Sequence, residues 1–257
     1  MTDRAEVITF VQLVGVIVMN VAQRIERTIA GMQDGTVFKY QELGIAATEY
    51  GAAAKAIERL KKKGIVDSAS AGVFYKPKKT LFGALKPSEE ELIKPYLYDN
   101  NKRVAYITGT ALYNRMGLTT QVPQNISIAS RDKRIITRIG NIQVRPVKSY
   151  VDVTNENYPL LEILDAIKDL KIIPDVDRNR AVQNLLGQIN NVSDKTKLAK
   201  IALKYPPRVR ALTGALLEQL GLKEIAAPLG KSINPLSAYA YGISSEALPT
   251  RTNWNLL

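Results

Sequence analysis

The stretch that decides the fold runs from Val37 to Pro77 and reads VFKYQELGIAATEYGAAAKAIERLKKKGIVDSASAGVFYKP. In order, it predicts a short helix, a turn, a longer basic helix that stops at a glycine, and two short strands around a Ser/Gly turn. A helix-turn-helix followed by a β-hairpin wing is the simplest structure with this order. Because the second helix of such a unit usually lies in the DNA major groove, the stretch predicts DNA binding.

The boundaries within this stretch follow from glycines and caps. A short helix is expected over residues 39–43, ending at Gly44. Thr48 stands where an N-cap is needed, and the longer helix is expected over residues 49–63, ending at Gly64. Strands are expected over 65–66 and 73–75, with the turn over 68–72. One face of the longer helix is apolar and predicts the core of this unit: Ala53, Ala56, Ile57 and Leu60.

Positive charge is concentrated in the same region. Residues 48–79 hold eight Lys or Arg against three Asp or Glu, a local excess of five. The whole chain of 257 residues has 36 basic and 24 acidic residues, a net charge of +12. A balance this basic favours a polyanionic partner. We expect the DNA contacts to come from the longer helix and the wing: Thr48, Tyr50, Lys55, Arg59, Lys62, Lys63, Lys76, Lys78 and Lys79.

The composition excludes several classes of chemistry. The chain has no cysteine and no histidine, so disulfides, thiol nucleophiles and Ser-His or Cys-His dyads are excluded, and zinc sites nearly so. The sequence has no phosphate-binding or dinucleotide-binding glycine loop. We therefore expect no catalytic residue, no metal and no cofactor, and a cytoplasmic protein rather than an enzyme.

An apolar run over residues 7–19 is too short to span a membrane and is interrupted by Gln12 and Gly15. It is also unconvincing as a signal peptide, because Asp3 and Glu6 stand before it. We interpret it as a packing or dimerisation segment, either a strand or a buried helix. No membrane partner is expected.

The rest of the chain predicts an α+β fold in three parts: an N-terminal extension over 1–20, a winged helix-turn-helix over 21–87 and a C-terminal domain over 88–257. A helix is expected over 21–32, and another begins at Ser88, which with Glu91 forms a capping box. Strands are expected over 104–107, 126–130, 134–139 and 142–146, and helices over 110–116, 159–170, 177–189, 194–204 and 207–220. The tail from residue 231 is expected to pack on this body, with Tyr239, Tyr241 and Trp254 as anchors.

One pair of carboxylates suggests an alternative function. Asp175-Val176-Asp177 resembles the D-x-D pair that holds metal in nucleotidyltransferases and related nucleases. No Gly-Ser turn precedes it, and Arg178-Asn179-Arg180 after it indicates the start of a helix. Asp175 or Asp177 as an N-cap is the favoured interpretation.

Several segments, taken together in their order and spacing, resemble the AbiEi-type antitoxins of bacterial type IV toxin–antitoxin and phage-defence systems. The resemblance covers about residues 21–257. It is carried by GLTTQVP at 117–123, YPPRVRAL at 205–212, KSINPLS at 231–237, RLKKKGI at 59–65, GVFYKP at 72–77 and the closing Trp254-Asn255.

The resemblance implies an N-terminal winged helix that binds and represses its own promoter. It also implies a C-terminal domain that counteracts a nucleotidyltransferase-like toxin. Inverted repeats in the promoter would imply two bound copies, as a homodimer or as cooperative monomers. Another alternative is a purely protein-binding neutraliser of the toxin with a vestigial winged helix.

Two groups in the C-terminal motifs are candidates for contact with a partner. Thr119, Thr120 and Gln121 form either a partner-facing loop or a structural turn. Arg208 and Arg210 follow two prolines at a helix start, where they either bind an acidic partner or an anion, or are simply solvated.

Overall fold

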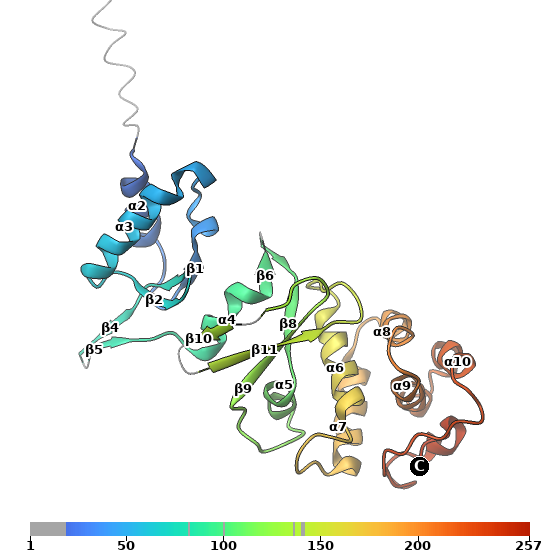
Figure 1. Ribbon diagram of the computed structural model, residues 1–257. Coiled ribbons are helices and arrows are strands. Elements are labelled where there is room, and N and C mark those ends of the chain that lie inside the picture. Colours follow the sequence, from blue (N-terminus) through green and yellow to red (C-terminus); the bar gives the residue numbers. More distant parts are fainter. Residues whose placement is uncertain (1–18, 82, 100, 136, 140–141) are drawn as a thin grey trace, which may run out of the picture. The chain divides into compact units, whose positions relative to one another are not determined.

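The computed structural model describes residues 19–81, 83–99, 101–135, 137–139 and 142–257. It is a mixed α+β protein, as predicted, and the chain divides into two compact units (Figure 1). We call them the N-terminal unit, Met1–Pro95, and the C-terminal unit, Tyr96–Leu257. The apolar run and the predicted extension lie outside the described residues, except for Met19 and Asn20. Among the described helices, none has the length and apolar character needed to cross a membrane.

The N-terminal unit begins with α2 (Val21–Ala30), the helix predicted over 21–32. Asn20 caps it, because its side chain accepts from the Gln23 amide and the Gln23 side chain accepts from the Asn20 amide. Both distances are 3.0 Å. Ile25 and Ile29, one helical turn apart, are fully buried. The amphipathic pattern of this helix is therefore confirmed.

The next elements are β1 (Val37–Lys39), the 3₁₀ turns η1 (Tyr40–Leu43) and η2 (Ala47–Glu49), and α3 (Tyr50–Lys62). The prediction placed Lys39 in a helix, which is wrong, because it ends a strand paired with β3. Thr48 as N-cap is also wrong. It lies inside η2, and the Glu49 carboxylate instead accepts from the Ala46 amide at 2.9 Å. The chain thus begins to coil before the position where a cap was expected.

The end of α3 matches the prediction. Gly64 adopts a left-handed φ of 65°, and its amide donates to the Lys61 carbonyl at 2.9 Å. The Ile65 amide donates to the Leu60 carbonyl at 3.0 Å, so the last carbonyls of the helix are satisfied.

A small antiparallel sheet follows, with the order β1-β3-β2. Its last two strands are β2 (Asp67–Ser70) and β3 (Val73–Tyr75). The first of them was predicted at 65–66, which is wrong, because the pairing with β3 starts at Asp67 opposite Tyr75. The turn is correspondingly shorter. Phe38 and Phe74 pack between the sheet and the helices, with ring centroids 6.0 Å apart.

After β3 the chain forms a two-stranded hairpin that was not predicted, β4 (Lys78–Thr80) and β5 (Gly83–Leu85). Helix α4 (Glu89–Leu97) comes next. Its predicted start is confirmed, since the Glu91 amide donates to the Ser88 hydroxyl at 3.3 Å. The reciprocal half of the capping box is replaced by an ion pair of Glu91 with Lys94 at 3.6 Å. The unit boundary falls between Pro95 and Tyr96, whereas the prediction drew it after residue 87.

The C-terminal unit contains a four-stranded sheet of order β10-β11-β9-β8. Its strands are β8 (Ala105–Thr108), β9 (Asn125–Ser130), β10 (Thr137–Ile139) and β11 (Ile142–Lys148). Strand β9 pairs antiparallel with β8 but parallel with β11. The third strand was predicted to start at Arg134, which is wrong: β10 begins at Thr137. A short hairpin, β6 (Tyr98–Asp99) with β7 (Lys102–Arg103), was not predicted.

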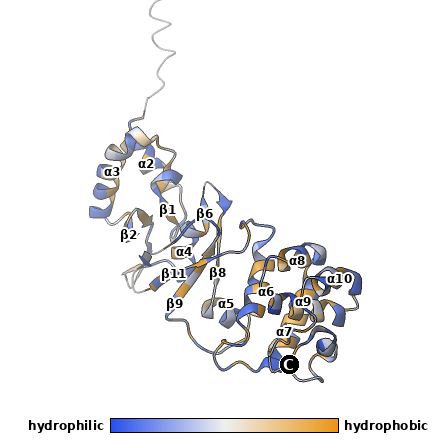
Figure 2. Cartoon of the chain, turned by 45° about the vertical axis from the view of Figure 1, so that its right-hand side comes forward, coloured by the Kyte–Doolittle hydropathy of each residue, from blue (hydrophilic) through white to orange (hydrophobic). Residues whose placement is uncertain are grey.

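Helices make up the rest of this unit. They are α5 (Thr110–Arg115), α6 (Tyr158–Asp169), α7 (Arg178–Asn191), α8 (Lys195–Ala202), α9 (Pro207–Gln219) and α10 (Lys223–Lys231), with the 3₁₀ turn η3 (Pro249–Trp254). The predicted stripe of α6 (Leu160, Leu161, Leu164 and Ile167) is buried, and Figure 2 shows hydrophobic residues concentrated along α6 and α9. Helix α10, which contains Pro228, was not predicted.

The tail packs on this body, as expected. The Trp254 indole lies against Gly214 of α9 and donates to the Glu218 carboxylate at 2.6 Å. The Tyr241 hydroxyl is buried and donates to the Ile167 carbonyl at 3.2 Å. Tyr239, half-buried, bridges to Leu256. The three aromatic residues are therefore packing anchors.

Candidate nucleic-acid interface

Helix α3 has two contrasting faces. Its apolar face, Ala53, Ala56, Ile57 and Leu60, is buried as predicted and belongs to the same core cluster as Ile25 and Ile29 of α2. With this face turned to α2 and the sheet, the opposite face is left to solvent. The opposite face is therefore available to a partner.

The solvent-facing side of α3 is basic. Lys55, Arg59 and Lys62 are exposed, and their spacing of four and three residues places them on one face, followed by Lys63. The Arg59 Nε donates to the Lys55 carbonyl at 3.3 Å, which directs the guanidinium along the helix surface. No described residue forms an ion pair with any of these four side chains. Their charge is not used within the unit.

The acidic residues of the same region are, in contrast, all engaged locally. Glu49 pairs with Arg24. The hydrogen bond from the Ala46 amide, and to a smaller extent the pairing with Arg24, holds the pKa of the Glu49 carboxyl below its usual value. Glu58 pairs with Lys61 at 3.2 Å. Asp67 accepts from the Tyr75 hydroxyl at 2.8 Å. The positive charge on the exposed face of α3 is thus only weakly offset.

Tyr50 and Thr48 do not join this face. Tyr50 precedes Lys55 by five residues, which is about 140° around the helix. Its ring packs beside that of Tyr40, with centroids 6.0 Å apart, and it is 37% exposed. Thr48 is exposed on η2, before the helix begins. Neither residue lies beside Arg59.

The wing lysines divide into two kinds. The Lys76 ammonium donates to the carbonyls of Ala30 at 3.2 Å and Met32 at 2.7 Å, and pairs with Asp34 at 3.4 Å. Lys76 therefore holds the C-terminal end of α2, where carbonyls lack helical partners. Lys78 and Lys79 are exposed on β4 and have no ion-pair partner among the described residues. Of the three predicted wing lysines, Lys78 and Lys79 are therefore the ones without an ion pair to a described residue.

The loop that was a candidate for partner contact is largely a structural turn. Thr119 is buried, and its hydroxyl accepts from the Gln121 amide at 3.2 Å. The Asn114 side chain donates to the Thr119 and Gln121 carbonyls at 3.3 and 3.1 Å. The Gln121 side chain donates to Asp175 at 3.2 Å. Thr120 is exposed, and its side chain has no hydrogen bond to another described residue.

The two arginines at the start of α9 also differ. Arg210 is half-buried and donates to the carbonyls of Tyr205 at 2.8 Å and Ser232 at 3.1 Å, so it joins α9 to the end of α10. Arg208 is exposed and donates to the Lys168 carbonyl at 3.2 Å. Of the pair, Arg208 is the one that a partner can reach.

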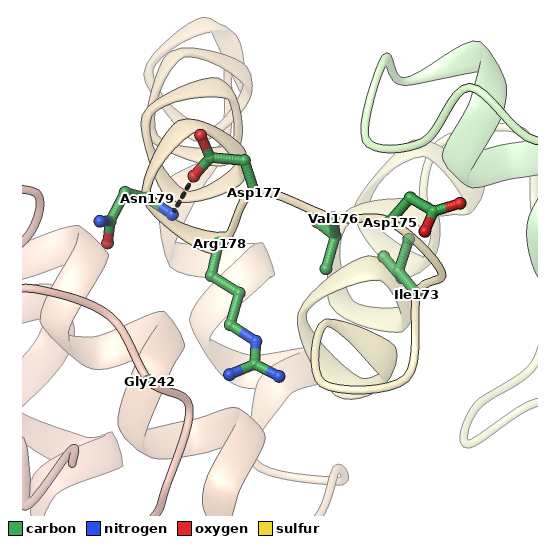
Figure 3. A pocket seen from close by; sticks show the side chains of 7 residues that line it. All are labelled: Ile173, Asp175, Val176, Asp177, Arg178, Asn179 and Gly242. Carbon is green, nitrogen blue, oxygen red and sulfur yellow. Dashed lines mark hydrogen bonds between the residues drawn. The ribbon is translucent and has the colours of Figure 1, made fainter.

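The two carboxylates of the D-x-D sequence do not converge. Asp177 caps α7, accepting from the amides of Asn179 and Arg180 at 3.0 and 3.1 Å, which confirms the N-cap interpretation. Asp175 has a left-handed φ of 55° and bonds to Gln121. Both residues line a surface pocket with Arg178 and Gly242, and Figure 3 shows their carboxyl groups pointing apart. This geometry does not form a two-carboxylate metal clamp.

A buried polar network in the C-terminal unit was not predicted. Asp165 of α6 is 1% exposed and accepts from Tyr106 at 2.9 Å, Thr108 at 2.8 Å, Lys168 at 2.9 Å and Tyr205 at 3.3 Å. Burial first, and then the charge of Asp165, raise the pKa of both tyrosines, so the phenols stay protonated and donate. The sequence could have indicated this buried aspartate, because Asp165 lies four positions after Leu161 and so on the apolar stripe of the helix.

Comparisons with known proteins give a match to a family model over part of the chain and a similar fold. Residues 24–146 match the model of a family of unknown function, DUF6088. No curated protein sequence matches. The chain is similar in structure to the RV2827C protein of Mycobacterium tuberculosis, seen in a crystal structure, with 13% identity, 86% of each chain covered and a TM-score of 0.52. That likeness concerns the fold.

Proposed function

We propose that this protein is a DNA-binding repressor and antitoxin of the AbiEi type. The observation that carries the DNA-binding half is the exposed basic face of α3, Lys55, Arg59, Lys62 and Lys63, which no described residue neutralises. The N-terminal unit would bind the promoter of its own operon. The protein would act in the cytoplasm by binding rather than by catalysis.

The order of elements supports a winged helix-turn-helix. Helix α2 is followed by a strand, a helical segment, the basic helix and a final hairpin, around a sheet of order β1-β3-β2. The 3₁₀ turns η1 and η2 take the place of the second helix. In this arrangement α3 is the recognition helix, which lies in the major groove.

The basic side chains of α3 and β4 would contact phosphates, and α3 would also contact bases. Lys62, Lys63, Lys78 and Lys79 would neutralise phosphates, which supplies affinity on any sequence. Gly51 and Ala52 are exposed at the start of α3 and allow the helix backbone to come close to base edges. Arg59 would then supply the long donor that can bond a guanine with two hydrogen bonds.

The antitoxin half rests on the resemblance of the motifs at 117–123, 205–212 and 231–237. We place contact with the nucleotidyltransferase-like toxin on the C-terminal unit, where Thr120 and Arg208 are the exposed members of the candidate residues. Two copies would bind an operator with two half-sites.

A binding titration tests the first half. The full chain is titrated into its promoter duplex and into a scrambled duplex of the same composition, at two salt concentrations. We expect promoter-selective binding. Lys62→Ala should lower affinity on both duplexes and reduce the salt slope by about one, while Arg59→Ala should lower the selectivity by about 1–3 kcal/mol.

Lys200→Ala is the matched control, because Lys200 is exposed on α8 of the other unit. Equal binding to both duplexes, with a slope that Lys62→Ala leaves unchanged, would refute the DNA-binding proposal. The second half is tested by co-expression with the neighbouring nucleotidyltransferase-like protein. If growth is not restored by a chain that binds its promoter normally, the protein is a repressor without antitoxin activity.

A further inference from the structure

The tail of the C-terminal unit contains a short extended segment that is paired along one edge. Tyr239 forms a parallel bridge with Leu256. The Tyr239 amide donates to the Asn255 carbonyl at 2.8 Å, and the Leu257 amide donates to the Tyr239 carbonyl at 2.9 Å. The Tyr241 amide also donates to the Leu257 carbonyl, at 2.8 Å. The inner edge of this segment is therefore satisfied by the fold.

The opposite edge of the segment is exposed and unpaired. The backbone groups of successive residues alternate in direction along an extended chain, so those of Ala238 and Ala240 point away from the bridge. Both alanines are exposed, and neither their N–H groups nor their carbonyls bond to a described residue. Residues 232–245 contain no charged side chain. Since edge strands are usually protected by charges, prolines or bulges, this edge is open to another strand.

A hydrogen-bonded turn fixes one end of the segment. The Ser237 amide donates to the Asn234 carbonyl at 3.1 Å, and the Leu236 amide donates to the Asn234 side chain at 2.9 Å. The Asn255 side chain donates to the Pro235 carbonyl at 2.9 Å. Leu236 is nevertheless 93% exposed on this turn. The turn thus holds a large apolar side chain in solvent beside the free edge.

An arginine lies at the other end of the segment. A Cβ added at Gly242 would be 2.6 Å from the Arg178 Nη1, so the guanidinium lies against the backbone there. The Arg178 side chain has no ion pair with a described residue, and Figure 3 shows it extending away from Asp175 and Asp177. The guanidinium can therefore donate to a carboxylate that arrives two residues beyond Ala240.

We infer that the free edge at Ala238 and Ala240 is a docking strand, to which a partner protein adds an extended segment with an acidic side chain held by Arg178. The inference rests on the antitoxin half of the proposed function, and the partner is the nucleotidyltransferase-like toxin. In strand addition, main-chain hydrogen bonds supply affinity and side-chain contacts supply specificity. Here Leu236 supplies an apolar contact at one end of the edge, and Arg178 supplies a charged contact at the other.

Charge and hydrogen bonding favour an acidic protein segment over other occupants. The whole chain has a net charge of +12, so two copies repel each other and an acidic segment is attracted. A nucleic acid fits the edge poorly, because phosphate oxygens accept from N–H groups but donate nothing to the carbonyls of Ala238 and Ala240. A strand of protein satisfies both kinds of group.

The first test is amide hydrogen exchange of the full chain, alone and bound to the purified neighbouring nucleotidyltransferase-like protein. In the free chain, the Ala238 and Ala240 amides should exchange freely, whereas those of Tyr239 and Tyr241 are already bonded. On binding, the two alanine amides should gain at least about tenfold protection. Protection confined to other parts of the C-terminal unit would overturn the inference.

The second test uses variants of the edge and of the arginine. Ala240→Pro removes the outward N–H, at a position where proline is tolerated because that group faces solvent. Toxin affinity should fall at least about tenfold, with the thermal midpoint and the Trp254 emission unchanged. Ala240→Ser, which keeps the N–H, should bind like the wild type. Arg178→Ala should weaken binding about fivefold. Arg180→Ala, also exposed on α7, is its control and should have no effect.

The outcomes separate this inference from the proposed function. Toxin binding that both Ala240→Pro and Arg178→Ala leave undiminished overturns strand addition but keeps direct contact. If the wild type restores growth without binding the toxin, the inference fails and the antitoxin activity stands. If it neither binds nor restores growth, both fail. A wild-type dimer that Ala240→Pro dissociates would overturn the inference by assigning the edge to a second copy. Should Ala240→Pro unfold, the exchange pattern and Arg178→Ala still decide.

Discussion

Two sets of basic side chains, one in each unit, are used in opposite ways. In the N-terminal unit, Lys55, Lys62 and Lys63 stand exposed without partners among the described residues. In the C-terminal unit, Lys168 reaches Asp165 at 2.9 Å and Arg210 reaches two carbonyls. A cation that the fold already uses cannot be offered to a partner at no cost, because its carbonyl or carboxylate would be left unsatisfied. Under the proposed function, the contrast assigns the polyanion to the N-terminal unit.

Asp165 gives the largest effect expected from removing one partner of an engaged cation. Asp165→Ala removes the acceptor shared by two tyrosines, a threonine and Lys168, and leaves a largely buried ammonium without its closest partner. We expect the free energy of unfolding of the C-terminal unit to fall by about 3–5 kcal/mol. Urea unfolding followed by the fluorescence of Trp254, the single tryptophan, measures this.

Asp152→Ala, at an exposed aspartate of the same unit, is the control and should change little. If Asp165→Ala unfolds at the wild-type urea concentration, the polar network is not what stabilises this unit. Promoter binding should survive in Asp165→Ala under native conditions, because α3 belongs to the other unit.

The second test concerns the closely packed tail. A Cβ added at Gly214 would lie 2.1 Å from the Trp254 ring, so Gly214→Ala forces the indole away from α9 and from Glu218. We expect a cost of about 1–3 kcal/mol in the free energy of unfolding, with a red shift of the tryptophan emission.

Gly187→Ala is the matched control, because Gly187 is also helical but a Cβ there would meet open space. It should be neutral or stabilise by up to about 1 kcal/mol. An unchanged emission spectrum in Gly214→Ala would mean that the indole does not need this packing.

A third test compares an engaged lysine and an exposed lysine within the N-terminal unit. Lys76→Ala removes the contacts that hold the end of α2, so we expect a loss of about 1–2 kcal/mol in stability and no change in the salt slope of DNA binding. Lys78→Ala should do the reverse, with stability within about 0.5 kcal/mol of wild type and the slope reduced by about one.

Thermal unfolding and the salt titration, made on both variants, give the answer. The same stability loss in the two variants would contradict the division between the lysines. So would a lower salt slope in Lys76→Ala alone.

The smallest expected effect is a pH dependence of the N-terminal unit. Burial, and then Asp67, raise the pKa of Tyr75 from 10.0 to about 12. Because the folded pKa is the higher one, the stabilisation is complete below pH 10 and is lost as the pH rises toward 12. The thermal midpoint should fall less over this range in Tyr75→Phe than in the wild type. Equal falls in both proteins would show that Tyr75 is not the group responsible.

The periodic parts of the chain were predictable from the sequence. Ala53, Ala56, Ile57 and Leu60 recur at helical spacing, and that spacing alone determines that one face of α3 is buried. Gly64 ends the helix because it can adopt a left-handed φ, which depends only on the residue itself. Asp177 caps α7 through its own neighbouring amides. Each of these features is local, so the sequence carries it directly.

The short strands were not predictable in the same way. Strands β1, β4 and β5 have three residues each, too few for an alternating pattern to stand out. Strand β3 is equally short but consists of Val, Phe and Tyr, which all favour strands, and it was predicted. Thr48 has the right chemistry for a cap, but the chain coils into η2 one turn earlier. Asp165 was overlooked because three of its four donors lie far from it in the sequence: Tyr106 and Thr108 on β8, and Tyr205 between α8 and α9.

The sequence by itself determined the fold class, the basic helix and its two faces, because periodicity, caps and charge are local properties. Only the tertiary structure decided which basic residues are free. Lys76 and Lys78 stand two positions apart and look alike in the sequence, yet Lys76 is held by α2 and Lys78 is exposed on β4. The physical reason is that a lysine is neutralised by whatever the fold brings within a few ångströms, and for Lys76 that is a helix end more than forty residues earlier in the chain.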